Sequence, residues 1–145
     1  MTTLVTHTPG ETEKAGAEFA RLLHPGDIVA LVGTLGSGKT RFVAGVCEAL
    51  EATGHFGSPT FTLINEYPAA GLTVVHADMY RISSRAEVAE LGLEEYFRRP
   101  YVCFIEWADH VLDLLPRGHY LVTFAHGGRE TERLIRIRKP GETSP

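Results

Sequence analysis

Cysteine is scarce in this sequence, and its two cysteines, Cys47 and Cys103, lie far apart along the chain. No Cys-x-x-Cys pair occurs, which argues against a zinc ribbon or a dithiol redox site. The seven histidines are scattered, and no two of them have the i, i+4 spacing of metal ligands on a helix. Both cysteines fall in apolar stretches, where a free thiol behaves as a small hydrophobic group. We therefore expect two buried, reduced thiols.

An excess of basic residues is also missing. The 14 lysines and arginines oppose 18 acidic residues, which gives a formal net charge of −4. This balance argues against a protein whose affinity comes mainly from neutralising nucleic-acid phosphates. No apolar run approaches the ~18 residues of a membrane span. The N-terminus has neither the basic start nor the apolar segment of a secretory signal. We therefore expect a cytoplasmic protein without membrane contact.

What remains is the composition of an ordinary globular domain. The chain has 145 residues, of which 43% are hydrophobic and 22% charged. This length fits one domain and leaves no room for a second core. We assign residues 1–139 to that domain. Residues 140–145 carry no apolar anchor, and we expect them to form a flexible tail.

Apolar periodicity and turn residues predict alternating strands and helices. Thr8, Pro9 and Glu11 are typical of a helix start, and Ser84 and Gly92 of the start and the break of another. The predicted helices cover residues 9–23, 40–50, 84–97 and 109–115. The predicted strands cover residues 4–6, 28–32, 61–67, 72–77, 101–105, 120–125 and 134–138. Residues 4–6 are expected at a sheet edge, and residues 28–32 in its centre, because a continuous apolar run suits a strand covered on both faces. The short link at residues 68–71 predicts an antiparallel hairpin.

One motif carries chemistry. The segment Gly33-Thr34-Leu35-Gly36-Ser37-Gly38-Lys39-Thr40 fits G-x-x-x-x-G-K-[ST], the P-loop. Glycines let the loop wrap a phosphate with inward N–H groups, and the next helix directs its positive end at the anion. Lys39 can reach the β- and γ-phosphates, and the Thr40 hydroxyl can bind Mg²⁺. We assign these eight residues, with Arg41, to nucleotide binding. The fold class follows: α/β, a single P-loop NTPase-like domain with a mixed sheet flanked by helices.

A Mg²⁺–nucleotide site also needs a carboxylate at the end of a neighbouring strand. Glu106 and Asp78 each end an apolar strand and would face the crevice where α/β sheets bind ligands. No Asn-Lys-x-Asp guanine-binding sequence occurs, so ATP is the expected nucleotide. The predicted catalytic residues are Lys39, Asp78 and Glu106, and the predicted metal ligands are Thr40 and Glu106.

Several residues stay open between a functional and a structural role. Thr60 could report the γ-phosphate, or belong to a plain turn before a strand. Arg81 could place a cation near phosphate, or be solvated. Trp107, the only tryptophan, could contact nucleotide or partner, or pack in the core. The basic residues of the last strand region could face an acidic partner or RNA, or protect an edge strand from pairing.

The motifs, in their order and spacing, resemble the TsaE (YjeE) family over residues 4–138. The motifs on which this resemblance rests are the P-loop, Ser58-Pro59-Thr60-Phe61, His76-Ala77-Asp78-Met79-Tyr80-Arg81 and Ile105-Glu106-Trp107. The resemblance implies an ATPase that assists threonylcarbamoyladenosine modification of tRNA, with TsaB and TsaD as partners and tRNA touched only indirectly. It also implies Mg²⁺ on Thr40 and Glu106, and roles for Asp78 and Trp107 in activity or partner contact. Thr34 and Ala108 depart from the family pattern, which usually has Asp and Pro there.

Two other functions are weighed against this one. A small-molecule P-loop kinase would need an acceptor pocket and an arginine-bearing lid, for which only Arg98 and Arg99 are candidates. A nucleotide-binding module without hydrolysis would not need the full set of Lys39, Thr40 and Glu106. We therefore predict a weak, Mg²⁺-dependent, partner-regulated ATPase, with the kinase as the alternative.

Overall fold

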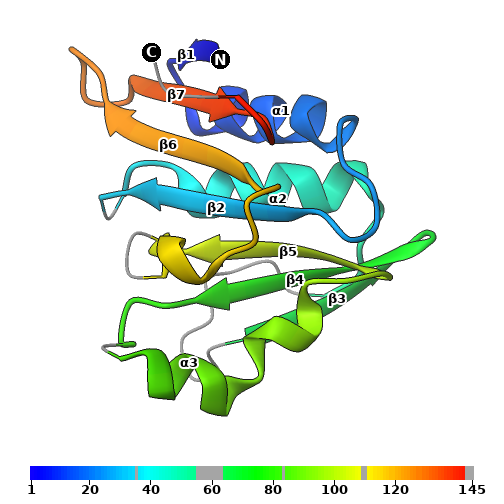
Figure 1. The fold of residues 1–145 in the computed structure, drawn as a ribbon. Coiled ribbons are helices and arrows are strands. Elements are labelled where there is room, and N and C mark those ends of the chain that lie inside the picture. The colour runs from blue at the N-terminus through cyan, green and yellow to red at the C-terminus, as the bar shows by residue number, and fades with distance from the viewer. Residues whose placement is uncertain (35, 55–63, 83, 109–110, 143–145) are drawn as a thin grey trace.

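The computed structural model describes residues 1–34, 36–54, 64–82, 84–108 and 111–142. Within them, seven strands form one mixed sheet in the order β1-β7-β6-β2-β5-β4-β3 (Figure 1). The strands are β1 (Thr2–Thr6), β2 (Ile28–Gly33), β3 (Ile64–Ala69), β4 (Leu72–Asp78), β5 (Tyr101–Glu106), β6 (Tyr120–His126) and β7 (Arg133–Arg138). β6, β2, β5 and β4 are parallel, and β1, β7 and β3 pair antiparallel at the two sides. The predicted α/β class and the β3–β4 hairpin are confirmed.

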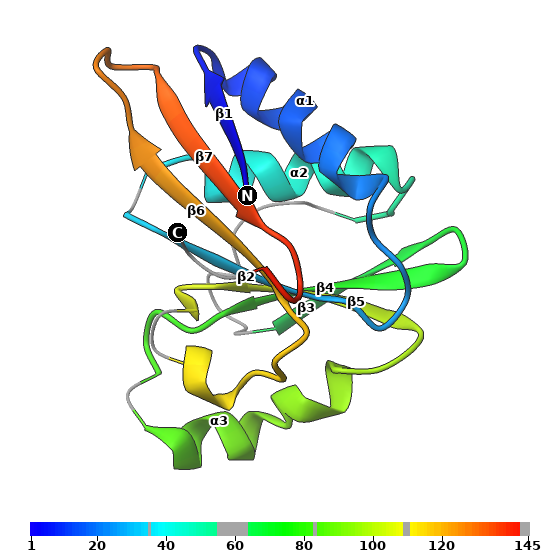
Figure 2. The same ribbon diagram turned by 45° about the horizontal axis from the view of Figure 1, so that its top comes forward.

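Helices cover both faces of the sheet (Figure 2). α1 (Pro9–Ala20) and α2 (Lys39–Ala49) lie on one face, and α3 (Arg85–Leu91) with the 3-10 turns η1 (Leu93–Tyr96) and η3 (Leu112–Leu114) lies on the other. Thr8 caps α1 by accepting a hydrogen bond from the Glu11 amide, as the sequence predicts. Ser84 caps α3, which ends at Gly92 in a left-handed conformation. No described helix is long and apolar enough to cross a membrane.

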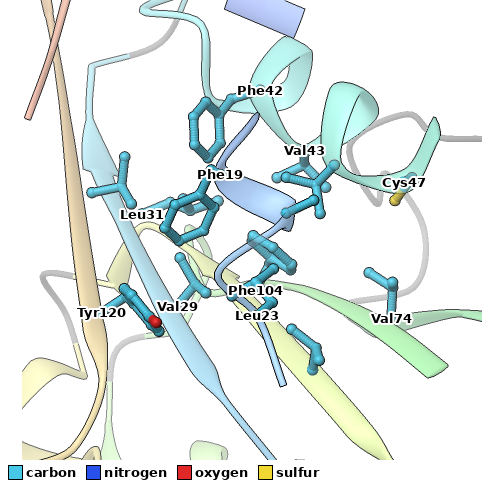
Figure 3. Close-up of a cluster of buried hydrophobic side chains, with 14 of the residues drawn as sticks. Phe19, Leu23, Val29, Leu31, Phe42, Val43, Cys47, Val74, Phe104 and Tyr120 are labelled. Carbon is cyan, nitrogen blue, oxygen red and sulfur yellow. The ribbon is translucent and has the colours of Figure 1, made fainter. Parts of the chain in front are cut away.

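The central place of β2 follows from its sequence. Val29, Ala30 and Leu31 have no exposed surface, because β2 is flanked by β5 and β6 and covered on both faces. Alternate residues therefore enter two separate cores, one under α1 and α2 and one under α3, η1 and η3. Figure 3 shows the first core, where Phe19 of α1 and Phe42 of α2 meet Leu31 and Phe104 of the sheet.

α1 and α2 approach each other through two glycines. A Cβ on Gly45 of α2 would lie 1.9 Å from the carbonyl oxygen of Glu13, and one on Gly16 of α1 would lie 2.0 Å from that of Phe42. Only residues without a side chain permit this spacing. The contact fixes α2, and with it the loop that precedes α2, against α1.

Two sequence-based expectations are corrected. The helix expected over residues 109–115 is, within the described part, only the short turn Leu112–Leu114, while Asp109 and His110 lie outside it. The last strand is not an edge strand, because β7 pairs with β1 on one side and β6 on the other. Its arginines therefore do not serve to protect an edge. Arg136 and Arg138 still share a face, opposite the one that bears Ile135 and Ile137.

Candidate functional site

The C-terminal ends of β2, β5 and β4 meet at one edge of the sheet (Figure 1). β2 leads there into the glycine-rich loop. Asp78, the last residue of β4, lies directly opposite Glu106, the last residue of β5. The structure thus brings both candidate carboxylates beside the P-loop. This is the edge where open α/β sheets bind ligands, because the chain leaves the neighbouring strands β2 and β5 toward opposite faces of the sheet (Figure 2).

The loop between β2 and α2 has the backbone of an anion site. Gly36 and Gly38 have φ of +76° and +107°, and Gly38 is the N-cap of α2 without a side-chain hydrogen bond. Such left-handed positions turn successive N–H groups toward one point, in front of the positive helix end. Ser37 is fully buried, and its hydroxyl has no hydrogen-bond partner among the described residues. The loop therefore offers donors for a phosphate.

Lys39 is buried and held on two sides. Its ammonium donates to the Gly33 carbonyl oxygen at 2.5 Å and lies 3.6 Å from the centre of the Trp107 ring. Trp107 also packs against the exposed ring of Tyr80, with the ring centres 4.8 Å apart and the ring planes tilted by 51°. Trp107 has φ of +58°, a conformation that costs about 1–3 kcal/mol for a residue with a side chain. This turn of the backbone at the end of β5 places the indole against the Lys39 ammonium.

Glu106 is almost fully buried and is paired with His76 of β4. The His76 Nε2 and Glu106 Oε2 atoms are 2.6 Å apart. Both residues occupy the sheet face that α2 covers, since they alternate with Ala77 and Ile105 of the opposite core. In the sequence, His76 stands out only as part of the motif His76-Ala77-Asp78-Met79-Tyr80-Arg81. Strand alternation could have identified His76, because side chains two residues apart lie on the same face and His76 therefore shares a face of β4 with Asp78.

Asp78 lies at the same edge but is half-buried. Its carboxylate accepts a hydrogen bond from the Tyr80 amide at 2.9 Å. Burial raises the pKa of Asp78 and the Glu106 charge adds to that shift, while the Tyr80 hydrogen bond, His76 and Lys39 oppose it. Asp78 is therefore a better proton acceptor than an exposed aspartate.

The donors at this edge fit Mg²⁺. No group of three or more His, Cys, Asp or Glu residues able to hold a metal occurs in the described part of the chain. Mg²⁺ does not need such a cage, since it is usually held by one or two carboxylates together with substrate phosphates and water. Thr40 at the start of α2 and Glu106 at the end of β5 are the residues that could supply such oxygens.

The other predicted site residues are paired elsewhere, exposed, or outside the described residues. The Arg41 guanidinium pairs with Glu13 of α1 at 2.8 Å. Thr34 and Arg81 are exposed. Leu35 and Thr60 lie outside the described residues.

Sequence reasoning missed a contact from the end of the chain to the P-loop. The Arg133 Nε donates to the Gly36 carbonyl oxygen at 3.2 Å, and its Nη1 donates to the carbonyl oxygens of Glu130 and Glu132. Arg133 thereby ties the β6–β7 turn to the glycine-rich loop. Strand alternation could have indicated this placement, because it puts Arg133 on the same face of β7 as Ile135, which packs under α1 and α2.

Comparison with known proteins agrees with this geometry. A family model described as "Threonylcarbamoyl adenosine biosynthesis protein TsaE" matches residues 6–135. The chain belongs to the TsaE family. A TsaE protein of Bacillus subtilis is 38% identical over 136 residues, which cover 94% of this chain and 84% of that protein. A TsaE protein of Treponema pallidum is 37% identical over 87% of this chain and 95% of its own length. A TsaE protein of Haemophilus influenzae is 33% identical over 84% of this chain and 82% of its own length.

The fold matches as well. The crystal structure of Bacillus subtilis YdiB superimposes with a TM-score of 0.82 at 34% identity, covering 97% of this chain and 86% of that one. The predicted resemblance and fold class are thus confirmed. As a member of the TsaE family, the chain takes part in tRNA threonylcarbamoyladenosine biosynthesis.

Proposed function

We propose that this chain binds ATP and hydrolyses it slowly with Mg²⁺, as an accessory of a TsaB–TsaD pair in threonylcarbamoyladenosine formation on tRNA. The observation that supports the proposal best is the meeting of Asp78, Glu106 and the P-loop lysine at one sheet edge. The reaction takes place where tRNA is modified, in the cytoplasm. Contact with tRNA is through the partners.

The chain's own groups divide the work. The loop from Gly33 to Thr40 receives the phosphates on its backbone N–H groups. Lys39 leaves the Gly33 carbonyl and the Trp107 ring to neutralise charge on the β- and γ-phosphates. Asp78, with its raised pKa, orients the attacking water and accepts hydrogen bonds from it. Thr40 and Glu106 hold Mg²⁺, and Arg41 lies at the rim of the nucleotide site.

Mg²⁺, when bound, neutralises the phosphate charge that develops in the reaction. Of the two arginines assigned to the site, Arg41 pairs with Glu13 of α1 and Arg81 is exposed, so neither is placed as an arginine finger in the described part of the chain. In other P-loop enzymes such a group raises the rate by about 10³–10⁵-fold. We therefore infer that hydrolysis by the isolated chain is weak, and that a partner surface completes the site. Thr60, Arg81 and Trp107 are the candidate switch or partner contacts.

ATP hydrolysis by the purified chain, alone and with TsaB and TsaD from the same source, tests this function. Mg²⁺-dependent turnover is expected, with a rate that changes when the pair is added. Lys39→Ala, Thr40→Ala and Glu106→Ala should each remove it while the far-ultraviolet circular dichroism stays unchanged. Lys14→Ala is the matched control, since it removes an exposed lysine of α1 and should leave turnover intact.

Two outcomes would contradict the proposal. Wild-type rates in Lys39→Ala or Thr40→Ala would exclude the P-loop as the site of hydrolysis. A pair that neither binds the chain nor alters its turnover would exclude the accessory role while leaving the ATPase in place.

The fold argues against the kinase alternative, because it places the candidate lid arginines away from the P-loop. Arg98 and Arg99 are exposed and precede β5, whereas Glu106 ends it. A six-residue strand is about 20 Å long, so this arginine pair is at the opposite end from the P-loop. Phosphate transfer to an added metabolite would revive the kinase.

A further inference from the structure

His76 makes the contact that calls for explanation beyond the proposed function. It lies inside β4 with 1% of its surface exposed, and its Nε2 is 2.6 Å from Glu106 Oε2. Its Nδ1 is buried and has no hydrogen-bond partner among the described residues. Buried polar atoms are nearly always satisfied. The buried Nδ1 thus costs desolvation free energy without a compensating hydrogen bond, and the Nε2 contact with Glu106 is the interaction that offsets this cost.

A purely structural role explains this pair poorly. Replacement of a buried charged or polar pair by apolar side chains is often neutral or stabilising, because desolvation offsets the attraction. Val74, two residues earlier on the same face of β4, is such an apolar side chain, fully buried in the α2-side core. Stability alone therefore gives no reason to expect an imidazole and a carboxylate rather than an apolar pair in this layer.

The His76 contact does, however, account for the orientation of the Glu106 carboxylate. Glutamate has a long side chain, and fixing one rotamer of such a chain costs about 1.5–2 kcal/mol in entropy. Glu106 is the last residue of β5, and the backbone turns sharply at Trp107 with φ of +58°. The imidazole reaches Glu106 diagonally from β4, since His76 itself lies opposite Phe104. The hydrogen bond holds one oxygen toward β4 and thereby sets the plane of the carboxylate.

We propose that His76 is a positioning residue, which donates from Nε2 to Glu106 and orients that carboxylate to bind the divalent cation of the nucleotide. The inference rests on the proposed function, because it takes Glu106 as a ligand. Hydrogen-bond partners of metal ligands change metal affinity or activity by about 10–100-fold when they are removed. His76 itself touches neither cation nor nucleotide.

Divalent-cation binding to the ADP complex tests the inference, with Mn²⁺ followed by electron paramagnetic resonance. His76→Leu removes the donor at similar volume. Its Mn²⁺ dissociation constant should rise by about 10–100-fold, while its affinity for ADP without metal stays at the wild-type value. In ATP hydrolysis, the half-saturating Mg²⁺ concentration should rise in parallel.

Two further variants separate positioning from packing. His76→Gln places an amide N–H near the position of Nε2 and should restore most of the Mn²⁺ affinity. Val74→Ala opens a cavity two residues away and should lower the melting temperature without changing Mn²⁺ affinity. If His76→Leu does not fold, His76→Asn takes its place, since its shorter amide cannot reach Glu106.

The outcomes are distinct. Wild-type Mn²⁺ affinity in His76→Leu or His76→Asn, or an equal loss in Val74→Ala, would overturn the positioning role and leave the ATPase proposal intact. A wild-type ADP complex that takes up no divalent cation would instead overturn the proposed Mg²⁺-dependent function, and the inference with it.

Discussion

The ammonium group of Lys39 lies 3.6 Å from the centre of the Trp107 ring. The lysine of the glycine-rich loop and the only tryptophan of the chain are therefore in contact. A cation over an aromatic ring is stabilised by about 0.5–2 kcal/mol, depending on how well it is desolvated. Phosphates are stronger partners for a lysine than an indole face. Under the proposed function, we therefore expect the Lys39 ammonium to leave the indole ring for phosphate oxygens when nucleotide binds.

Trp107 is accordingly expected to report nucleotide binding. Titration with ADP should change the tryptophan emission of the wild-type chain as Lys39 leaves the ring. Lys39→Met removes the cation and should abolish the nucleotide-dependent change. An unchanged emission spectrum at an ADP concentration that calorimetry shows to be saturating would contradict this exchange.

Asp78→Asn should separate stability from activity. The pKa of Asp78 is raised from its ordinary value of 3.8, mainly by burial. The folded chain thus holds the proton more tightly than the unfolded chain, so this contribution to stability is fully present below pH 3.8 and is lost as the pH rises through the raised pKa. Asparagine stays neutral and can still accept the Tyr80 hydrogen bond.

The expected result is a higher melting temperature for Asp78→Asn at pH 7, with a gain that shrinks toward pH 4, and loss of ATP hydrolysis at both. Differential scanning calorimetry across this pH range checks it. A variant less stable than the wild type at pH 7 would show that the charged carboxylate is a net stabilising group.

Gly45→Ala is expected to destabilise the fold although alanine is the better helix former. The alanine methyl group would meet the Glu13 carbonyl oxygen of α1 at 1.9 Å. Overpacking of this kind costs about 1–3 kcal/mol or more, against about 1 kcal/mol gained in helix propensity. Gly10→Ala is the control, since its Cβ would meet only the Thr8 hydroxyl at 3.8 Å. Urea unfolding should show a lower midpoint for Gly45→Ala and an equal or higher one for Gly10→Ala.

Arg133→Met should weaken nucleotide binding through the loop. The variant loses the hydrogen bond from Nε to the Gly36 carbonyl oxygen, worth about 1 kcal/mol at an exposed site. We expect ADP affinity to fall about fivefold, since 1.4 kcal/mol is tenfold. Arg136→Met is the matched control, because it removes an exposed arginine from the face of β7 opposite to Arg133. Equal ADP affinities in the two variants would contradict a role of Arg133 in holding the loop.

The sequence predicts most strands well, because the apolar runs of β2 and β5 admit only a covered sheet. It fails at the segment after Trp107, where a helical pattern yields only the turn Leu112–Leu114 in the described residues. It also fails at β7, where a basic strand looks like an edge. Which strand becomes an edge depends on pairing with the N-terminal β1, a contact between residues more than 120 positions apart that no local pattern encodes.

Residue type and spacing alone point to the P-loop, its lysine and the two carboxylates, because these features match the chemistry expected of a site for phosphate and Mg²⁺. Their surroundings come from the folded chain: His76 contacts Glu106, Trp107 lies against Lys39, and Arg133 donates to Gly36. Each of these contacts joins residues far apart in the chain. Their distances follow from strand order and register, which come from the packing of the whole sheet and not from any single segment.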